Sequence, residues 1–176
     1  MTTQGPVVVV LASGRGERFI ASGGSGSKLQ ALLAGKPVLE HTLAAVRASG
    51  LRWHLEDAGH EGMGDSIAAA VRATRNAGGW LVLPGDLPLI RPATLLAVAK
   101  ALEDHEAVVP VYRGRRGHPV GFSAACGSEL CALEGKEGAA RVLHAWGAME
   151  LIVGDVGAVT DIDTVDDLEA ARRLSK

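Results

Sequence analysis

Residues 6–30 read PVVVVLASGRGERFIASGGSGSKLQ, and this stretch decides the fold class. Val7 to Leu11 form a continuous apolar, mostly β-branched run bounded by Pro6 and by glycines, which is typical of a strand buried on both faces in a parallel sheet. A buried strand, a glycine-rich turn and then a helix place backbone N–H groups at the carboxyl edge of the sheet, where open α/β folds bind ligands. The stretch therefore predicts an α/β fold with an anion site after its first strand.

The length and composition indicate a single globular domain. The chain has 176 residues, of which 47% are hydrophobic and 22% are charged. Domains commonly run to about 100–150 residues, and a chain of this size buries most of the surface that its unfolded state exposes. We therefore expect residues 1–176 to form one domain.

Nothing in the sequence indicates a membrane, a nucleic acid or a disulfide framework. The apolar start PVVVVLA is too short to span a bilayer and has no basic segment before it. A formal net charge of −2 does not suggest a polyanionic partner. Cys126 and Cys131 lack the spacing of a CxxC motif, which fits reduced thiols. We expect a cytoplasmic protein whose partners are small molecules.

Short apolar runs alternate with helical patterns along the rest of the chain. Three further buried strands are expected, at Trp80–Leu83, Ala107–Tyr112 and Glu150–Val153. Helices are expected from Pro37 to Gly50, from Asp65 to Ala77, after Pro92, and after an N-cap at Thr164. This alternation predicts an α/β layer fold.

The basic side chains of the opening loop point to phosphate. Arg15, Arg18 and Lys28 add positive charges to the backbone N–H groups, and phosphate often needs both. Two familiar phosphate loops do not fit, because a dinucleotide fingerprint meets Phe19 at its third glycine and a P-loop would need glycine in place of Ser27. The alternative interpretation is a flexible surface loop whose glycines only make turns.

Two acidic segments follow at positions that suit a divalent cation. Asp86, within LVLPGDLPLI at 81–90, stands where a buried strand leaves the sheet, on the same edge as the loop if the strands are parallel. In DIDTVDD at 161–167, Asp161 and Asp163 would point the same way if locally extended, and either could complete the site. Magnesium is typically held by one or two carboxylates plus substrate phosphates. The alternative is that these acids only cap turns and helices.

In this order, the three segments resemble the MobA-like nucleotidyltransferases, most closely the molybdenum cofactor cytidylyltransferases. The resemblance spans most of the chain and rests on the segments LASGRGERF…SKLQALLAGKPVLEHTL, GMGDSI, GDLPLI, GHPVGF and DIDTVDDL. It implies a three-layer, Rossmann-like nucleotidyltransferase fold with a mostly parallel sheet. Residues 50–62 are too short for the strand, loop and helix usual there, so one βα unit is expected to be missing or compressed. An alternative traces RWHLE as a strand, with one helix lost.

The resemblance also implies roles for individual residues. It makes Arg15, Arg18, Lys28 and Asp86 catalytic, with Asp86 and Asp163 as the ligands of Mg²⁺. The implied nucleotide-binding and acceptor-side positions are Leu11, Ser13, Gly14, Gly16, Gly62, Met63, Gly64, Ser66 and His118.

The implied reaction transfers a nucleoside monophosphate from an NTP to a phosphorylated acceptor such as molybdopterin and releases pyrophosphate. CTP is the favoured NTP and GTP is the alternative, with a molybdoenzyme maturation protein as the implied partner. An ionised acceptor needs positioning and charge neutralisation rather than a general base. The rival hypotheses are a GTP-dependent or sugar- or alditol-phosphate nucleotidyltransferase of the same fold, and a non-catalytic nucleotide-binding relative.

Overall fold

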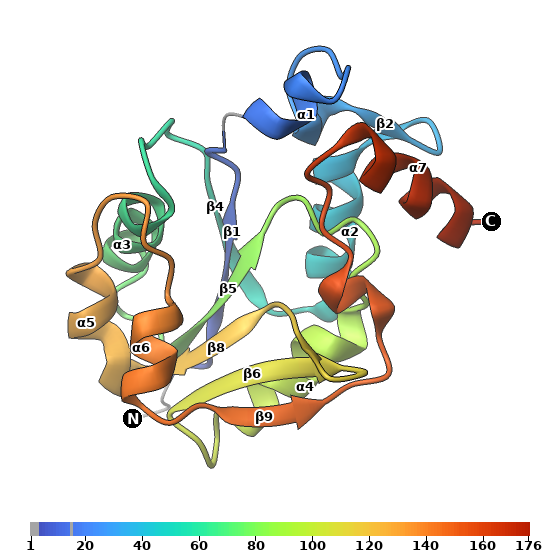
Figure 1. Cartoon of the computed structure of the whole chain (residues 1–176). Coiled ribbons are helices and arrows are strands. Elements are labelled where there is room, and N and C mark those ends of the chain that lie inside the picture. The colour runs from blue at the N-terminus through green and yellow to red at the C-terminus, as the bar shows by residue number, and fades with distance from the viewer. Residues whose placement is uncertain (1–3, 15) are drawn as a thin grey trace.

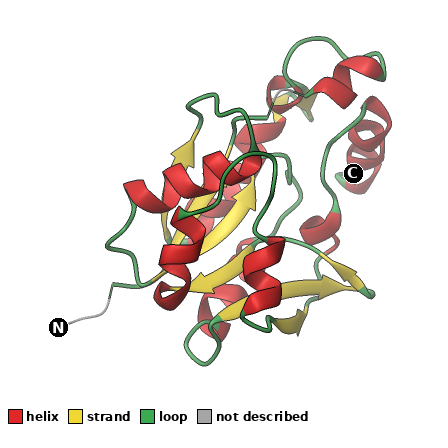
Figure 2. Ribbon diagram, turned by 60° about the vertical axis from the view of Figure 1, so that its left-hand side comes forward, coloured by secondary structure: helices red, strands yellow, loops and turns green. Residues whose placement is uncertain are grey.

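A seven-stranded sheet forms the centre of the computed structural model, which describes residues 4–14 and 16–176 (Figures 1 and 2). Its strands are β1 (Val7–Leu11), β4 (Arg52–Glu56), β5 (Gly79–Pro84), β6 (Ala107–Tyr112), β7 (Arg115–Arg116), β8 (Val120–Ser123) and β9 (Met149–Ile152). The order across the sheet is β4-β1-β5-β8-β6-β7, and β9 also pairs with β6. A separate small hairpin consists of β2 (Leu32–Leu33) and β3 (Lys36–Pro37).

The sheet is mostly parallel, as the resemblance implied. β1 pairs in parallel with β4 on one side and with β5 on the other, so that Val9 lies between His54 and Val82. β8 runs antiparallel to both β5 and β6, and β9 runs parallel to β6. The carboxyl ends of β1, β4 and β5 therefore meet at one edge of the sheet.

Helices cover both faces of the sheet. They are α1 (Glu17–Ala21), α2 (Val38–Ser49), α3 (Met63–Ala73), α4 (Pro92–Ala101), α5 (Gly127–Cys131), α6 (Ala140–Ala145) and α7 (Val165–Leu174), with 3₁₀ turns η1 (Lys28–Gln30), η2 (Ala124–Cys126) and η3 (Val156–Val159). Figure 1 shows α3, α5 and α6 on one side of the sheet and α2 and α4 on the other. Within the described part of the chain, no helix has the length and apolar character needed to cross a membrane.

Alternate side chains of β1 enter two different cores. Val7, Val9 and Leu11 pack with residues of α3, α5 and α6, whereas Val8 and Val10 pack with residues of α2 and α4. Each valine of the strand is at most 4% exposed. A strand covered on both faces has no solvent side, which is why its sequence is apolar throughout.

The shortened region 50–62 contains a strand but no helix. RWHLE forms β4, as the alternative trace had it, and residues 57–62, all described, lead directly into α3. The four strands expected elsewhere are present with shifts of one residue at some ends. The sheet therefore keeps a strand beside β1 although the chain is too short for the usual unit.

The helix expected from Asp65 to Ala77 begins and ends earlier than predicted. α3 runs from Met63 to Ala73, and Asp65 lies in its first turn, where its Oδ1 accepts a hydrogen bond from Gly135 N at 3.1 Å. Residues 74–78 form a turn rather than helix, closed by the Ala77 N to Thr74 O bond of 2.9 Å. The partner of Asp65 lies 70 residues further along the chain, and the Ala77–Thr74 bond closes a turn, so the local pattern misplaced both ends of the helix.

The last helix begins where the sequence predicts. Thr164 Oγ1 accepts from Asp167 N at 3.2 Å, and Asp167 Oδ2 accepts from Thr164 N at 2.9 Å, which completes a capping box. The same Asp167 oxygen accepts from Asp163 N at 3.0 Å. α7 packs through Leu168 on a small apolar cluster that includes Phe19. Phe19, which stands where a dinucleotide fingerprint would have its third glycine, is therefore a core residue. Asp167, which caps the helix, therefore also holds the backbone of Asp163.

Replacing Thr164 with Ala should lower the free energy of unfolding by about 1 kcal/mol, because Asp167 N loses its acceptor at the first turn. Urea denaturation monitored by circular dichroism measures the change. The exposed Ser128→Ala, in α5, should change it by less than about 0.5 kcal/mol. Equal losses in the two variants would contradict a contribution from the cap.

Candidate active site

The glycine-rich loop and Asp86 lie together because β1 and β5 are parallel neighbours. Leu11, the last residue of β1, is in register with Pro84, the last residue of β5. Gly85 N donates to Leu11 O at 2.8 Å, and a Cβ on Gly85 would lie 3.0 Å from that oxygen. This close approach of two backbones brings Asp86 beside the loop that follows β1.

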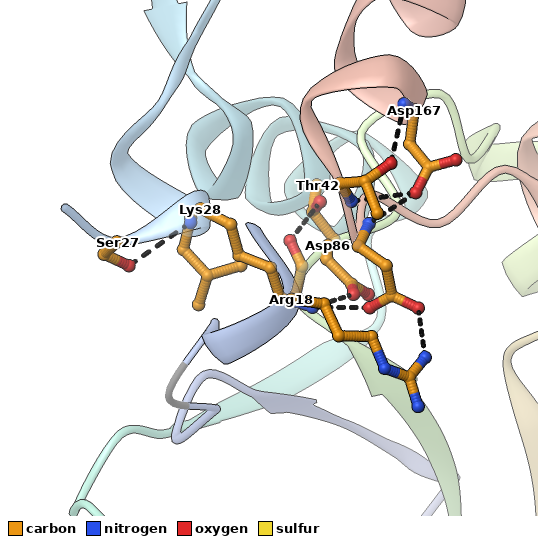
Figure 3. A network of polar contacts seen from close by, with 10 residues as sticks. Arg18, Ser27, Lys28, Thr42, Asp86 and Asp167 are labelled. Atoms are coloured by element: carbon orange, nitrogen blue, oxygen red, sulfur yellow. Dashed lines mark hydrogen bonds and ion pairs between the residues drawn. The ribbon is translucent and has the colours of Figure 1, made fainter. Parts of the chain in front are cut away.

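Lys28 lies between the two acids that the sequence had placed in one site. Its Nζ donates to Asp86 Oδ2 at 2.8 Å and to Asp163 Oδ1 at 3.0 Å (Figure 3). Arg18 joins the same group through a 3.3 Å bond from its guanidinium to Asp163 Oδ2.

The turn η1 presents Lys28, and Ser27 begins that turn by accepting a hydrogen bond from Leu29 N. Arg15, the other expected catalytic residue, lies outside the described residues.

The charges of this group shift one another's pKa values. Burial alone would lower the pKa of Lys28, but its contacts with Asp86 and Asp163 outweigh burial and raise it. Burial raises the pKa of Asp86, and Lys28 only partly opposes this effect. Burial also acts to raise the pKa of Asp163, yet the contacts with Lys28 and Arg18 prevail and lower it. Burial also raises the pKa of Asp161, so two of the three acids of this group have raised pKa values.

Three carboxylates in this group fit a divalent cation. Asp86, Asp161 and Asp163 each offer an oxygen, and these oxygens lie within 4.8 Å of one another. Asp86 Oδ1 is buried, and among the described residues it has no hydrogen-bond partner. An unsatisfied buried carboxylate oxygen is costly, and a hard cation such as Mg²⁺ takes oxygen ligands of this kind. Asp161, left as an alternative by the sequence, therefore lies close enough to the two expected ligands to share an ion with them.

A cavity at the same edge collects most of the expected nucleotide-binding residues. Its lining residues come from the end of β1, the glycine-rich loop, η1, the start of α3 and the turn after β5: Leu11, Ser13, Gly14, Lys28, Leu29, His60, Glu61, Gly62, Met63, Ser66, Pro84, Gly85 and Asp86. An adjoining groove adds Gly16, Arg18, Lys136 and Asp163. The glycine-rich loop, residues 62–66 at the start of α3 and the acids therefore line one continuous site.

Gly64 contributes to packing at the start of α3. Its N–H donates to Gly135 O at 2.9 Å, and a Cβ at this position would lie 2.7 Å from the carbonyl oxygens of Glu134 and Glu137. Its backbone donor is thus already used. This contact holds segment 134–137 against the start of α3.

His118 borders a second part of the groove, next to the acids. This part is lined by Arg115, Arg116 and His118 together with Asp86 and Asp161. Burial lowers the pKa of His118 despite the nearby charge of Asp161, so its ring is neutral at neutral pH. A further cavity behind His118 has a mostly apolar lining: Leu11, Met63, Ile67, Val82, Pro84, Val109, Arg116, Gly117, His118, Val120, Gly138, Ala139, Ala140 and Leu143.

Sequence reasoning missed Glu56, His60 and Lys136 in this region. Glu56 is the last residue of β4, and its position at the end of a strand was the only available signal. His60 lies in the short connection after it and lines the same cavity as Leu11, Ser13 and Gly14. Lys136, between Gly135 and Glu137, carries no local signal, because the packing of its loop against α3 brings it to the groove.

A family profile described as the MobA-like NTP transferase domain matches residues 44–150. The chain belongs to this family. The resemblance stated from the sequence is therefore confirmed at the level of the family, while its cytidylyltransferase type remains a hypothesis.

Two curated relatives are similar to this chain over most of its length. The purine catabolism protein PucB of Bacillus subtilis (strain 168) is 33% identical over 131 residues, which cover 69% of this chain and 62% of PucB. The phosphoenolpyruvate guanylyltransferase of Streptomyces avermitilis is 34% identical over 148 residues, which cover 82% of this chain and 66% of that protein. The chain thus spans less than two thirds of the length of either relative.

Solved structures share the fold of this family member over nearly its whole length. The crystal structure of Rv0371c from Mycobacterium tuberculosis H37Rv matches with a TM-score of 0.82 and 26% identity, covering 98% of this chain and 100% of the other. Molybdopterin-guanine dinucleotide biosynthesis protein A from Archaeoglobus fulgidus matches with a TM-score of 0.70 and 20% identity, covering 96% and 98% of the two chains. The latter likeness concerns the fold alone.

Asp163→Asn should destabilise the metal-free protein at neutral pH and not at acid pH. Because the folded pKa of Asp163 is lowered, its ionised form adds stability that is present above the unfolded pKa of about 3.9 and is lost as pH falls through the folded value. The urea midpoint of the variant should lie below that of the wild type at pH 7, and the difference should shrink progressively as the pH falls below about 4. The exposed Asp166→Asn is the control. A gap that stays constant down to pH 3 would be inconsistent with this ion pair.

Proposed function

We propose that residues 1–176 form one nucleotidyltransferase domain that transfers a nucleoside monophosphate from an NTP to an anionic acceptor. The observation that carries the proposal is the group of Lys28, Asp86 and Asp163 beside the glycine-rich loop. It combines basic and metal-directed side chains at the edge where open α/β folds bind ligands. Membership of the MobA-like family supports the same reaction.

The reaction is an in-line displacement at the α-phosphorus. An ionised acceptor oxygen forms the new O–P bond, the bond from the α-phosphorus to the bridging oxygen breaks, and pyrophosphate leaves with the bonding electron pair. A phosphate acceptor is already ionised at neutral pH, so no side chain has to remove a proton. Catalysis then depends on placing the two substrates and neutralising the charge on the transferred and leaving phosphates.

The residues of the site divide this work. The backbone of Gly14 and Gly16 approaches the phosphates, and Arg18 and Lys28 offset their charge. Mg²⁺ held by Asp86 and Asp163, with Asp161 beside them, would supply further charge neutralisation when bound. Rv0371c has been crystallised with manganese, which supports a divalent cation in this fold.

We favour CTP as the donor because the sequence resembles the cytidylyltransferases, and GTP is the alternative because one curated relative is named a guanylyltransferase. The acceptor is proposed to be a phosphorylated compound such as molybdopterin. The largely apolar cavity behind His118 favours an acceptor with a ring system over a polyol phosphate. A molybdopterin acceptor would also imply a molybdoenzyme maturation protein as a partner.

Nucleotide with Mg²⁺ should raise the apparent stability of the purified protein. A ligand that binds only the folded state adds about 2.7 kcal/mol at a concentration 100 times its Kd. Thermal unfolding should therefore shift upward with CTP or GTP in the presence of Mg²⁺, and Asp86→Asn should remove the Mg²⁺-dependent part. Asp104→Asn, an exposed change after α4, is the control. No shift with any of the four NTPs would refute the proposed function.

Lys28→Ala should lower kcat for pyrophosphate release by a factor of about 10²–10³, the usual cost of removing one group that stabilises transition-state charge. The assay follows pyrophosphate from CTP or GTP with a phosphorylated pterin as acceptor. Lys100→Ala, whose side chain is 81% exposed on α4, should keep wild-type turnover. Full activity of Lys28→Ala would remove this lysine from the proposed mechanism.

A further inference from the structure

A buried carboxylate joins two histidines at the end of β4, beside the nucleotide cavity. Glu56 is 8% exposed, and its carboxylate accepts from His54 Nε2 at 3.0 Å and from His60 Nε2 at 2.9 Å. Its backbone oxygen accepts from Ala12 N at 2.9 Å and from Ser13 Oγ at 3.3 Å. The cluster is therefore tied to the start of the glycine-rich loop, and the reaction proposed above does not use it.

The cluster determines which nitrogen of each ring carries hydrogen. Burial acts to raise the pKa of Glu56, but the hydrogen bonds from His54 and His60 outweigh burial and lower it, so the group is ionised at neutral pH. An ionised carboxylate only accepts hydrogen bonds. Nε2 of both rings must then be the donor, and a neutral His60 ring keeps Nδ1 as an acceptor.

The two histidines differ in what they face. His60 belongs to the lining of the nucleotide cavity, next to Gly62 and Met63 at the start of α3. His54 lies within β4, in register with Val9, and is not among the described residues that line that cavity. Both histidines therefore donate to the Glu56 carboxylate, but only His60 also lines the cavity.

We infer that His60 reads the nucleobase of the NTP, with its Nδ1 accepting a hydrogen bond from an amino group of the base. Glu56 is the positioning residue that holds the ring. The inference rests on the proposed function and names a specificity determinant of the same site. An acceptor at this point favours an amino group over a carbonyl oxygen, which distinguishes cytosine, with its N4 amino donor, from a pyrimidine with an O4 acceptor.

The test compares two pairs of nucleotides that differ by an amino group, CTP with UTP and GTP with ITP. Dissociation constants are measured with Mg²⁺ for the wild type, His60→Ala, Glu56→Gln and His54→Ala. The wild type should prefer the amino nucleotide about tenfold in at least one pair, the size expected for one hydrogen bond. His60→Ala should reduce the ratio to about one or two, Glu56→Gln should reduce it in part, and His54→Ala should keep it.

The ratio separates base reading from a merely structural role, because a loosened site would weaken all four nucleotides alike. If the wild type binds none of them, both the inference and the proposed function fail. If the wild type binds them without preference in either pair, or if His60→Ala keeps the preference, the inference alone fails. Should Glu56→Gln not fold, as circular dichroism would show, His60→Ala against His54→Ala decides, since each removes one hydrogen bond from the same carboxylate.

Discussion

The parallel pairing of β1 with β5 brings the glycine-rich loop and Asp86 together at one edge of the sheet. Because Leu11 and Pro84 end their strands side by side, the loop after one and the acid after the other leave the sheet at the same point. The turn at Gly85 is held from two directions, by its own N–H to Leu11 O and by Thr42 Oγ1, which donates to Gly85 O at 2.8 Å (Figure 3). These two hydrogen bonds therefore fix the backbone before Asp86 beside the end of β1.

Bringing Asp86 and Asp163 together requires a positive charge between them, and Lys28 supplies it. Its amino group lies within 3.0 Å of both carboxylates. Leaving either charge of a buried pair without its partner is strongly unfavourable, so the lysine and the acids depend on one another. In the proposed reaction the same amino group faces the phosphates of the NTP. In that reaction one side chain would serve both as the counterion of the two acids and as a binding group for the substrate.

Local patterns predicted what local physics controls. The apolar run Val7–Leu11, the proline that opens α4 and the cap at Thr164 act within a few residues of themselves, and the structure has them where the sequence placed them. Lys28 and Asp86 are 58 residues apart, and the sequence placed them at one edge of the sheet only through the expectation of parallel strands and through the family resemblance. The start of α3 depends on segment 134–137, a neighbour that only the folded chain supplies, and no short pattern encodes it.

The direct passage from β4 to α3 leaves β4 as an outer strand of the sheet. Among the described strands β4 pairs with β1 alone, so one side of its backbone has no strand beside it. Sheets protect such edges from aggregation by keeping the strand short and by placing charged side chains on it. β4 has five residues, begins with the exposed Arg52, and has Arg47 5.7 Å from the ring centre of its exposed Trp53. The outer strand is therefore short and has two arginines, Arg47 and Arg52, on it or beside it.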